Sequence, residues 1–408
     1  MNYGGRFGDL WLLLTGLMLL VSVVAQQVSL FMVGAVLLAT AGISRLWERY
    51  CLSRIEYSRT IAPARAFPGE AVELHITLVN RKPLPLAWLE VEDEVPDGIA
   101  FSGDVQLTSS FKTGRRLLGH LLALRWYERV IRTYRFTAPP RGYYSFGPLT
   151  MRSGDLFGLF STERTQPAED HLIVYPEVRP MAALGLPPRF LIGDMRLKRS
   201  LVQDPMRMVG VREYTPGDSI RQVHWRATAR AQRLQVKQLE ATTSLDLLIF
   251  LNVSTTVPDW LGVAPALMER AVTTAASVAD HALAHSYRVG LYANANPPGS
   301  DQQLRIEVGR AGDQRLRVLE ALAKVTGLAT VSMEAFLRRE TRSLPWGATL
   351  LIVTSVLPEG MLASLTRLRR AGRQVAVVYT GDAAAPGHFA GIPVYTTQWT
   401  DDGELELA

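Results

Sequence analysis

The chain has 408 residues, of which 48% are hydrophobic, and its formal net charge is +6 at pH 7. This length predicts two or three domains rather than one. The single cysteine, Cys51, excludes an internal disulfide and a cysteine metal cluster. The high hydrophobic fraction indicates a membrane segment somewhere in the chain.

Residues 1–54 predict a helical hairpin with two transmembrane helices. Apolar runs cover about 10–25 and 28–46, and Gln26-Gln27 separates them. Runs of about 16 and 19 residues form about 24 and 28 Å of helix, against roughly 30 Å for the core of a bilayer. The alternative is a cleaved signal peptide, because Val23 and Ala25 suit a cleavage site.

Basic residues at the end of the second run set the expected orientation. Arg45, Arg49 and Arg54 lie there, and loops rich in lysine and arginine stay in the cytoplasm. We therefore expect a multi-pass protein of the inner (plasma) membrane. Its partner is then the lipid bilayer, and the bulk of the chain faces the cytoplasm.

Residues 55–175 predict an antiparallel β-sandwich-like domain. Val72, Leu74, Ile76 and Leu78 alternate with polar residues, which is typical of a strand with one buried face. Proline and glycine divide the stretch into short strands. We expect a spacer, with peptide binding at a sheet edge as the alternative. Residues 176–200, which follow, are rich in proline and predict a linker.

Residues 201–240 contain the most unusual stretch of the chain. Pro216-Gly217 predicts a turn. Asp218 then stands where a helix N-cap belongs and can accept a hydrogen bond from the amide of Arg221. We expect a short basic helix after it and a strand at 234–240, where apolar and polar residues alternate.

This segment is also the basic centre of the molecule. Between Asp194 and Glu240, ten lysine and arginine residues stand against five acidic ones, a balance of +5. Nucleic-acid binding is one interpretation of such a charge. Arginines interleaved with carboxylates fit ion pairing or an acidic partner near the membrane better, so we expect no nucleic acid as a partner.

Residues 241–408 alternate predicted strands and helices, which indicates a doubly wound, Rossmann-type α/β domain. No glycine-rich phosphate loop follows the first strand, so we expect no nucleotide cofactor. The expected strands are 245–251, 287–292, 304–308, 350–354 and 374–379, and the expected helices are 264–285, 314–325 and 359–370.

The loop after the first of these strands is similar to the Asp-x-Ser-x-Ser metal loop of von Willebrand A domains. Its positions are Asn252, Ser254 and Thr256, and Ser355 stands where that fold commonly supplies a second aspartate. Mg²⁺ requires hard, anionic oxygen ligands. We therefore expect a von Willebrand A-like fold whose metal site is degenerate and binds no metal.

A long motif carries a resemblance to a known family. Its residues are Arg212, Glu213, Tyr214, Pro216, Gly217, Asp218, Arg221, His224, Trp225, Arg230, Lys237 and Glu240. With them, the chain resembles domain-of-unknown-function family fifty-eight. The resemblance extends to the membrane hairpin, the β-domain and the α/β domain. It implies an accessory role beside MoxR-type AAA+ ATPases and other von Willebrand A proteins, in the assembly or maturation of other proteins.

Three roles are open for this motif. In a structural role, Arg212 pairs with Asp218 or Glu240, and Trp225 fills the joint between domains. In a binding role, arginines such as Arg230 contact a partner. In a catalytic role, acidic and basic side chains act on a substrate.

We expect a membrane-anchored cytoplasmic scaffold or adaptor that catalyses no reaction itself. The alternative is a membrane-bound hydrolase that uses Asp218, His224, Lys237 and Glu240 as acid, base and charge stabiliser. No other histidine forms a metal spacing with His224, so we predict no metal there.

Overall fold

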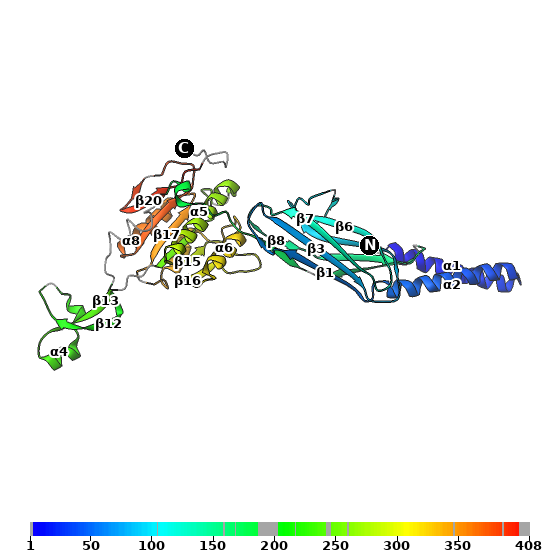
Figure 1. Ribbon diagram of the computed structural model, residues 1–408, viewed down its shortest axis with the longest axis horizontal. Helices are drawn as coiled ribbons and strands as arrows, with labels where there is room; N and C mark the ends of the chain where they lie inside the picture. The colour runs from blue at the N-terminus through cyan, green and yellow to red at the C-terminus, as the bar shows by residue number, and fades with distance from the viewer. Residues whose placement is uncertain are drawn as a thin grey trace. The chain divides into compact units, whose positions relative to one another are not determined.

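The computed structural model describes residues 3–103, 105–157, 160–167, 169–186, 203–216, 218–241, 246–258, 261–345, 347–385 and 387–399 (Figure 1). The chain divides after Tyr175 into two compact units. We describe each unit by itself.

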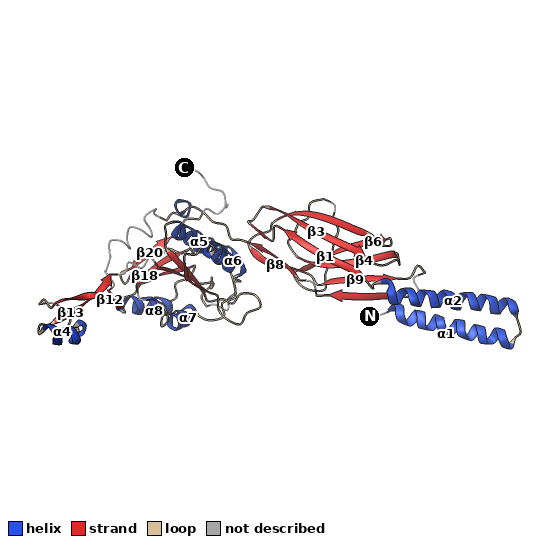
Figure 2. Cartoon of the chain, turned by 60° about the horizontal axis from the view of Figure 1, so that its bottom comes forward, coloured by secondary structure: helices blue, strands red, loops and turns tan. Residues whose placement is uncertain are grey.

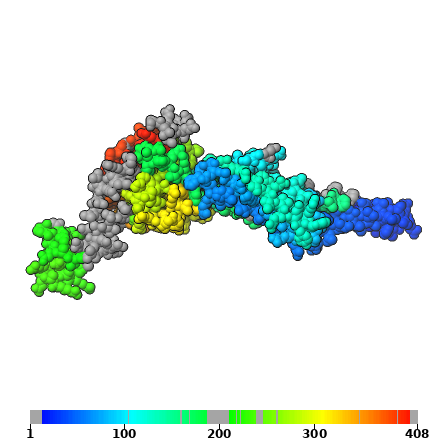
Figure 3. Space-filling view, viewed as in Figure 1, coloured from blue at the N-terminus to red at the C-terminus, as the bar shows by residue number. Residues whose placement is uncertain are grey.

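The first unit begins with two helices that pack against each other, α1 (Tyr3–Val24) and α2 (Val28–Cys51). In the described part of the chain, α2 alone is long and apolar enough to cross a membrane, and the apolar helix Leu13–Val24 is shorter than a span. Side chains along α2, such as Met32 and Val36, are exposed. The helical pair is the dark blue part of Figure 3. The structure thus supports one candidate membrane helix. The predicted multi-pass arrangement with two spans is not supported, because the described apolar part of the first helix is too short.

Among its described residues, the first unit continues with eleven strands in three sheets, with orders β1-β3-β7, β10-β9-β4-β6-β5 and β2-β11-β8. Neighbours pair antiparallel except β2 and β11. The strands are β1 (Ile55–Ala62), β2 (Arg65–Ala66), β3 (Ala71–Asn80), β4 (Leu86–Pro96), β5 (Leu107–Ser109), β6 (Arg115–Leu124), β7 (Arg129–Thr137), β8 (Gly142–Phe146), β9 (Leu149–Gly154), β10 (Ser161–Gln166) and β11 (Asp170–Val174).

The core of this β-domain lies between the sheets. The alternating residues of β3, from Val72 to Leu78, are buried as the sequence predicts. Val72 and Leu74 pack in one cluster with Val95 of β4 and Leu172 of β11, which joins all three sheets. Apolar burial of this kind is the main stabilising contribution to such a domain.

A charged cluster is buried in the same domain. Arg59 Nη1 lies 2.5 Å from Asp93 Oδ1, and both side chains are fully buried. Arg59 also donates to Asp170 Oδ2 at 2.9 Å and to the carbonyl of Phe146 at 2.8 Å, and the Tyr57 hydroxyl donates to Asp93 Oδ2 at 2.7 Å. One guanidinium therefore connects the three sheets.

Helix α2 ends inside the core of the β-domain. Cys51 and Leu52 belong to one apolar cluster with Ile55 and Leu78. The ammonium group of Lys82 is buried and donates to the carbonyls of Cys51 and Ser53, the latter at 2.9 Å. A cation is favourable at this position, because the last carbonyls of a helix lack partners within the helix.

The second unit contains a seven-stranded sheet of order β16-β15-β14-β17-β18-β20-β19. The five central strands are parallel, and the edge strands β16 and β19 pair antiparallel. The strands are β14 (Asp246–Leu251), β15 (Arg288–Ala293), β16 (Arg305–Gly309), β17 (Thr349–Thr354), β18 (Gln374–Tyr379), β19 (His388–Phe389) and β20 (Ile392–Thr396), and the helices are α5 (Pro265–Ala284), α6 (Gln314–Lys324), α7 (Met333–Glu340) and α8 (Glu359–Arg370).

Helices cover both faces of this sheet, α5 and α6 on one side and α7 and α8 on the other (Figure 2). Every residue of β14 and of β17 is buried, as parallel strands covered on both faces require. The chain passes from β14 to β15 on one side and later returns to β17 on the other. In open α/β sheets, ligands bind beyond the carboxyl ends of the strands at such a reversal.

The start of the predicted linker is folded onto this α/β domain. Its 3-10 helix η1 (Met181–Leu184) contacts α5, and the amide of Arg179 donates to Ser277 Oγ at 2.9 Å. Leu184 and Leu186 are buried. Residues 187–202, which include the rest of the predicted linker, lie outside the described part of the chain.

Candidate functional site

The family motif folds as a two-stranded ribbon with a helical insertion. Strands β12 (Gln203–Glu213) and β13 (Gln235–Ala241) pair antiparallel, so that Arg212 lies opposite Val236. Between them lie the 3-10 helix η2 (Ile220–Gln222) and helix α4 (Trp225–Ala231). We call residues 203–241 the arm. The strand expected at 234–240 is confirmed as β13.

A two-point ion pair organises the turn at the tip of β12. Arg212 Nη1 and Nη2 donate to Asp218 Oδ2 and Oδ1 at 2.7 and 2.6 Å. Asp218 Oδ2 also accepts from the amide and the hydroxyl of Thr215, at 2.8 and 2.9 Å. These bonds, first the one from Arg212, hold the pKa of the Asp218 carboxyl well below its usual range.

The carboxylate of Asp218 therefore faces backward along the chain. The sequence predicts Asp218 as an N-cap that accepts from the amide of Arg221. In the structure its carboxylate instead accepts from the preceding residues Arg212 and Thr215. Helix α4 begins later than expected, and its cap is His224, whose Nδ1 accepts from the amide of Ala227 at 3.0 Å.

Large apolar side chains of the arm lie on its surface. Trp225 is 66% exposed and Ile220 71% exposed, and Leu234 is also exposed. The interpretation of Trp225 as a buried plug is wrong for this structure. Val223 and Val236, which pair in an isolated β-bridge, are buried. The arm thus has an ordered turn above a very small core.

The remaining motif residues are spread over the arm. Glu213 pairs with Arg233 at 3.2 Å, and Lys237 is exposed. The amide of Tyr214 donates to the carbonyl of Leu234 at 2.9 Å. Pro216 and Arg230 are exposed. Gly217 and the side chains of Arg221 and Glu240 lie outside the described part of the chain.

Two members of the expected catalytic set already have structural partners. Asp218 is engaged by Arg212 and Thr215, and His224 Nδ1 caps α4. A general base needs a free lone pair within reach of a substrate proton. The geometry of the arm therefore favours an ordered surface over an acid–base site.

A second candidate site lies at the carboxyl ends of the parallel strands. Each of these strands is followed by a buried, neutral side chain that forms hydrogen bonds. These residues are Asn294 after β15, Asn252 after β14, Ser355 after β17, Thr380 after β18 and Thr397 after β20. We call them the neutral rim. Asn294, Thr380 and Thr397 were not among the residues expected at this site, although Asn294 and Thr380 each directly follow an apolar strand in the sequence.

Hydrogen bonds between members of the neutral rim, and one to Thr354, satisfy its side chains. Asn252 donates to Thr354 Oγ1 at 3.0 Å and accepts from Asn294 Nδ2 at 3.0 Å. The hydroxyls of Ser355 and Thr380 lie 2.8 Å apart. These bonds occupy the place where the reversal of the sheet predicts a ligand.

The four positions of the degenerate metal loop do not share one centre. The amide of Ser254 donates to Asn252 Oδ1 at 3.2 Å, whereas Thr256 Oγ1 donates to the carbonyl of Gly262 at 2.8 Å. Ser355 Oγ donates to the carbonyl of Leu267 at 3.2 Å. Among the described residues, no group of three or more His, Cys, Asp or Glu side chains is placed to hold a metal ion.

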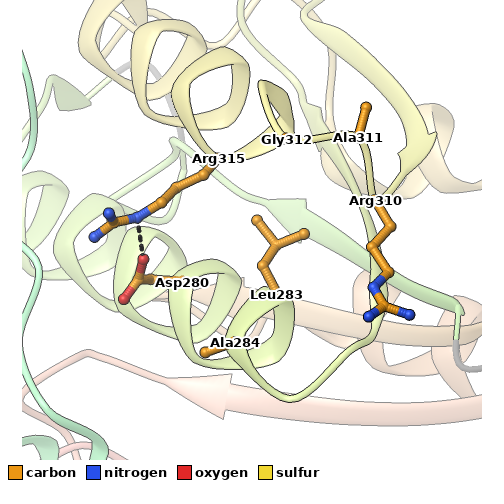
Figure 4. Close-up of a pocket in the computed structure, with 7 residues that line it drawn as sticks. All are labelled: Asp280, Leu283, Ala284, Arg310, Ala311, Gly312 and Arg315. Atoms are coloured by element: carbon orange, nitrogen blue, oxygen red, sulfur yellow. Dashed lines mark hydrogen bonds and ion pairs between the residues drawn. The ribbon is translucent and has the colours of Figure 1, made fainter.

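A pocket of about 480 Å³ lies between the end of α5 and the loop before α6 (Figure 4). Because α5 ends there and β15 begins shortly after, the pocket lies at the amino ends of the strands, away from the neutral rim. Arg315 pairs with Asp280, Arg310 donates to Ser286, and the two arginines point away from each other. None of the site residues that the sequence predicts lines this pocket.

Comparisons with known proteins agree with the motif. Residues 210–383 match the model of the family described as "Protein of unknown function DUF58". The chain is 24% identical over 211 residues to the uncharacterized protein YeaD of Bacillus subtilis, which covers 50% of this chain and 49% of that protein. The chain thus spans about half the length of the curated relative it matches.

Solved structures give only faint similarity. The CARDB domain of a Pyrococcus furiosus protein matches with 12% identity and a TM-score of 0.20, over 29% of this chain and 89% of that one. A non-cellulosomal cohesin of Archaeoglobus fulgidus matches with 9% identity and a TM-score of 0.20, over 29% and 91%. Similarities this low do not bear on fold or function.

Proposed function

This chain belongs to the DUF58 family through residues 210–383, and from this premise we propose that it is a membrane-anchored scaffold or adaptor with no catalysis of its own. The α/β domain is, in this proposal, von Willebrand A-like. The polar loop after β14, at the reversal of the strand order, supports that assignment. The arm then provides the surface that binds a partner protein.

The observation that carries this proposal is the exposed apolar surface of the arm. Ile220, Trp225 and Leu234 are exposed around a turn that the Arg212–Asp218 pair holds in place. Tryptophan and arginine are the side chains most often found at the energetic centre of protein interfaces. A turn fixed before binding loses less conformational entropy on association.

The partner we propose is a MoxR-type AAA+ ATPase, with other von Willebrand A proteins as further partners. The family resemblance supports this choice. The exposed arginines of α4, Arg226 and Arg230, favour an acidic partner surface, since complementary charge speeds association. Assembly or maturation of other proteins is the process that the resemblance implies.

A double substitution in the arm tests the binding role. The full chain, purified in detergent, is titrated with the MoxR-type ATPase of its own organism. We expect I220S/W225S to weaken binding at least tenfold, because loss of an interface hot spot costs about 2 kcal/mol or more. The control is V257S/L328S, which removes two other exposed apolar side chains of the second unit. Equal binding by wild type and I220S/W225S would contradict the proposal.

In this proposal, α2 anchors the protein in the inner membrane, and the chain after α2 lies in the cytoplasm. Arg45, Arg49 and Arg54 at its carboxyl end support this orientation. Alkaline phosphatase fused after Ala408 should be inactive, whereas a fluorescent protein at the same position should fluoresce. An active phosphatase would reverse the orientation and would also contradict the proposed partner, because the arm would then lie on the other side of the membrane from a cytoplasmic ATPase.

A further inference from the structure

A second open pocket, of about 700 Å³, lies where the last turns of α2 pass β10. Its charged lining is Arg45, Glu48 and Arg49 from α2 with Glu163 and Arg164 from β10. One apolar and two hydroxyl side chains complete it, Leu52, Ser53 and Thr162. Three arginines against two carboxylates give this pocket a formal charge of +1. Arg49, Glu163 and Arg164 are exposed to solvent.

The pocket lies at the level where α2 becomes apolar. The guanidinium of Arg45 stacks over the ring of Phe160, 5.2 Å from its centre. Arg45 is the pocket residue nearest to the apolar stretch of α2, and Phe160 is the last residue before β10. Phe160 therefore lies on the apolar side of the pocket.

This loop presents two apolar side chains to the surroundings. Leu156 and Phe157 are 64% and 65% exposed. The carboxylate of Asp155 fixes the backbone at Phe157 and Phe160, because it accepts from their amides at 3.1 and 2.8 Å. Exposed apolar side chains next to basic ones are typical of segments that enter the interface of a membrane.

We propose that this pocket binds the headgroup of one phospholipid. Arg49 and Arg164 hold the phosphate, because a guanidinium donates two parallel hydrogen bonds to phosphate oxygens. The formal charge of +1 favours an anionic headgroup, and Glu48 and Glu163 can accept from its hydroxyl groups, which phosphatidylglycerol provides. Leu156 and Phe157 enter the acyl region beside it. This inference rests on the proposed membrane anchoring through α2.

Native mass spectrometry of the full chain in detergent tests the proposal, with dioleoyl phosphatidylglycerol as the probe. We expect wild type to retain one lipid saturably and to prefer it to dioleoyl phosphatidylcholine, which lacks donor groups. R49Q/R164Q should bind about 25-fold more weakly, since each basic residue at a lipid surface contributes about 1 kcal/mol, or about fivefold. R116Q/R132Q, which removes two exposed arginines elsewhere in the β-domain, should bind like wild type.

A second variant, L156S/F157S, keeps every arginine and should weaken phosphatidylglycerol binding at least threefold. Equal binding by wild type and R49Q/R164Q, or no preference over phosphatidylcholine, would overturn the proposal. Displacement of the lipid by an equal concentration of glycerol phosphate would also overturn it, in favour of a soluble ligand. A carbonate wash of membranes distinguishes failure of the anchor from failure of the pocket. Release of wild type from the membranes refutes anchoring through α2, whereas retention without lipid preference refutes only phospholipid binding in the pocket.

Discussion

Two arginine–aspartate pairs of this chain have the same chemistry in opposite surroundings. Arg59 and Asp93 are fully buried in the β-domain, whereas the side chains of Arg212 and Asp218 in the arm are 45% and 14% exposed. The N–O distances are nearly equal, at 2.5 and 2.6 Å. Burial removes the water that would otherwise solvate each charge, so the loss of one partner is severe in the first pair and mild in the second.

The pKa values of the two aspartates move in opposite directions. Burial raises the pKa of Asp93, although Arg59 and Tyr57 act against it. The hydrogen bonds from Arg212 and Thr215 lower the pKa of Asp218, where little desolvation opposes them. The arginine–aspartate pair of the β-domain thus stabilises the whole domain, whereas the pair of the arm stabilises only one turn.

The largest expected effect is the loss of Arg59. R59A leaves Asp93 buried without its counter-charge, at a cost of roughly 3–5 kcal/mol in the free energy of unfolding. Thermal unfolding of the full chain in detergent should show an early transition. The exposed residue Arg132 provides the control R132A, which should melt like wild type. If R59A melted at the same temperature as R132A, the buried pair would not stabilise the domain more than an exposed pair does.

A smaller effect should follow at the neutral rim. N252D replaces an amide that donates to Thr354 Oγ1, and the hydroxyl of Thr354 already donates to the carbonyl of Val356. The new carboxylate would be buried with one partner lost, so we expect about 1–3 kcal/mol of destabilisation. Chemical denaturation measures it, with Q302E as an exposed control. A stability equal to wild type would mean that the rim tolerates charge.

Titration of His120 should change stability by about 1–2 kcal/mol between pH 7 and pH 5. Burial, assisted by Arg132, lowers the pKa of His120 from 6.5 to about 4. The unfolded chain then binds the proton more readily than the folded chain, so stability is lost as pH falls from about 6.5 toward 4. Melting across this range should show the decline in wild type and a flatter profile in H120Q. Identical profiles would exclude His120 as the cause.

The smallest effect on global stability should come from R212A. R212A leaves the Asp218 carboxylate at the surface of the arm, where it still accepts from the amide and the hydroxyl of Thr215, so the melting temperature should stay close to that of wild type. Hydrogen exchange at the Thr215 amide should instead become faster, because its acceptor Asp218 loses the side chain that orients it. A melting temperature for R212A as low as that of R59A would contradict this, because the exposed pair would then stabilise the chain as much as the buried pair.

Local patterns predict part of this molecule well. The alternation from Val72 to Leu78 predicts a buried face of β3, and the alternation at 234–240 predicts β13. Strand–helix alternation predicts the layered α/β domain. In each case the signal lies within a few neighbouring residues, and burial of one face is what the pattern encodes.

Interactions that depend on the fold are not visible in the same way. Arg59 meets Asp93 and Asp170 across 34 and 111 residues of sequence, and no local pattern pairs them. The position of Asp218 after Pro216-Gly217 suits a helix N-cap. Its carboxylate instead pairs with Arg212, six residues earlier in the sequence. Trp225 is apolar, yet the small arm contains too little core to bury it.

The junction of α2 with the β-domain has a mechanical consequence. Helix α2 ends among buried core residues, and Lys82 holds its last carbonyls, so the helix and the domain turn as one body. A helix in a bilayer adjusts its tilt to the thickness of the hydrocarbon layer. Under the proposed anchoring through α2, a change in membrane thickness would therefore tilt the β-domain together with the helix.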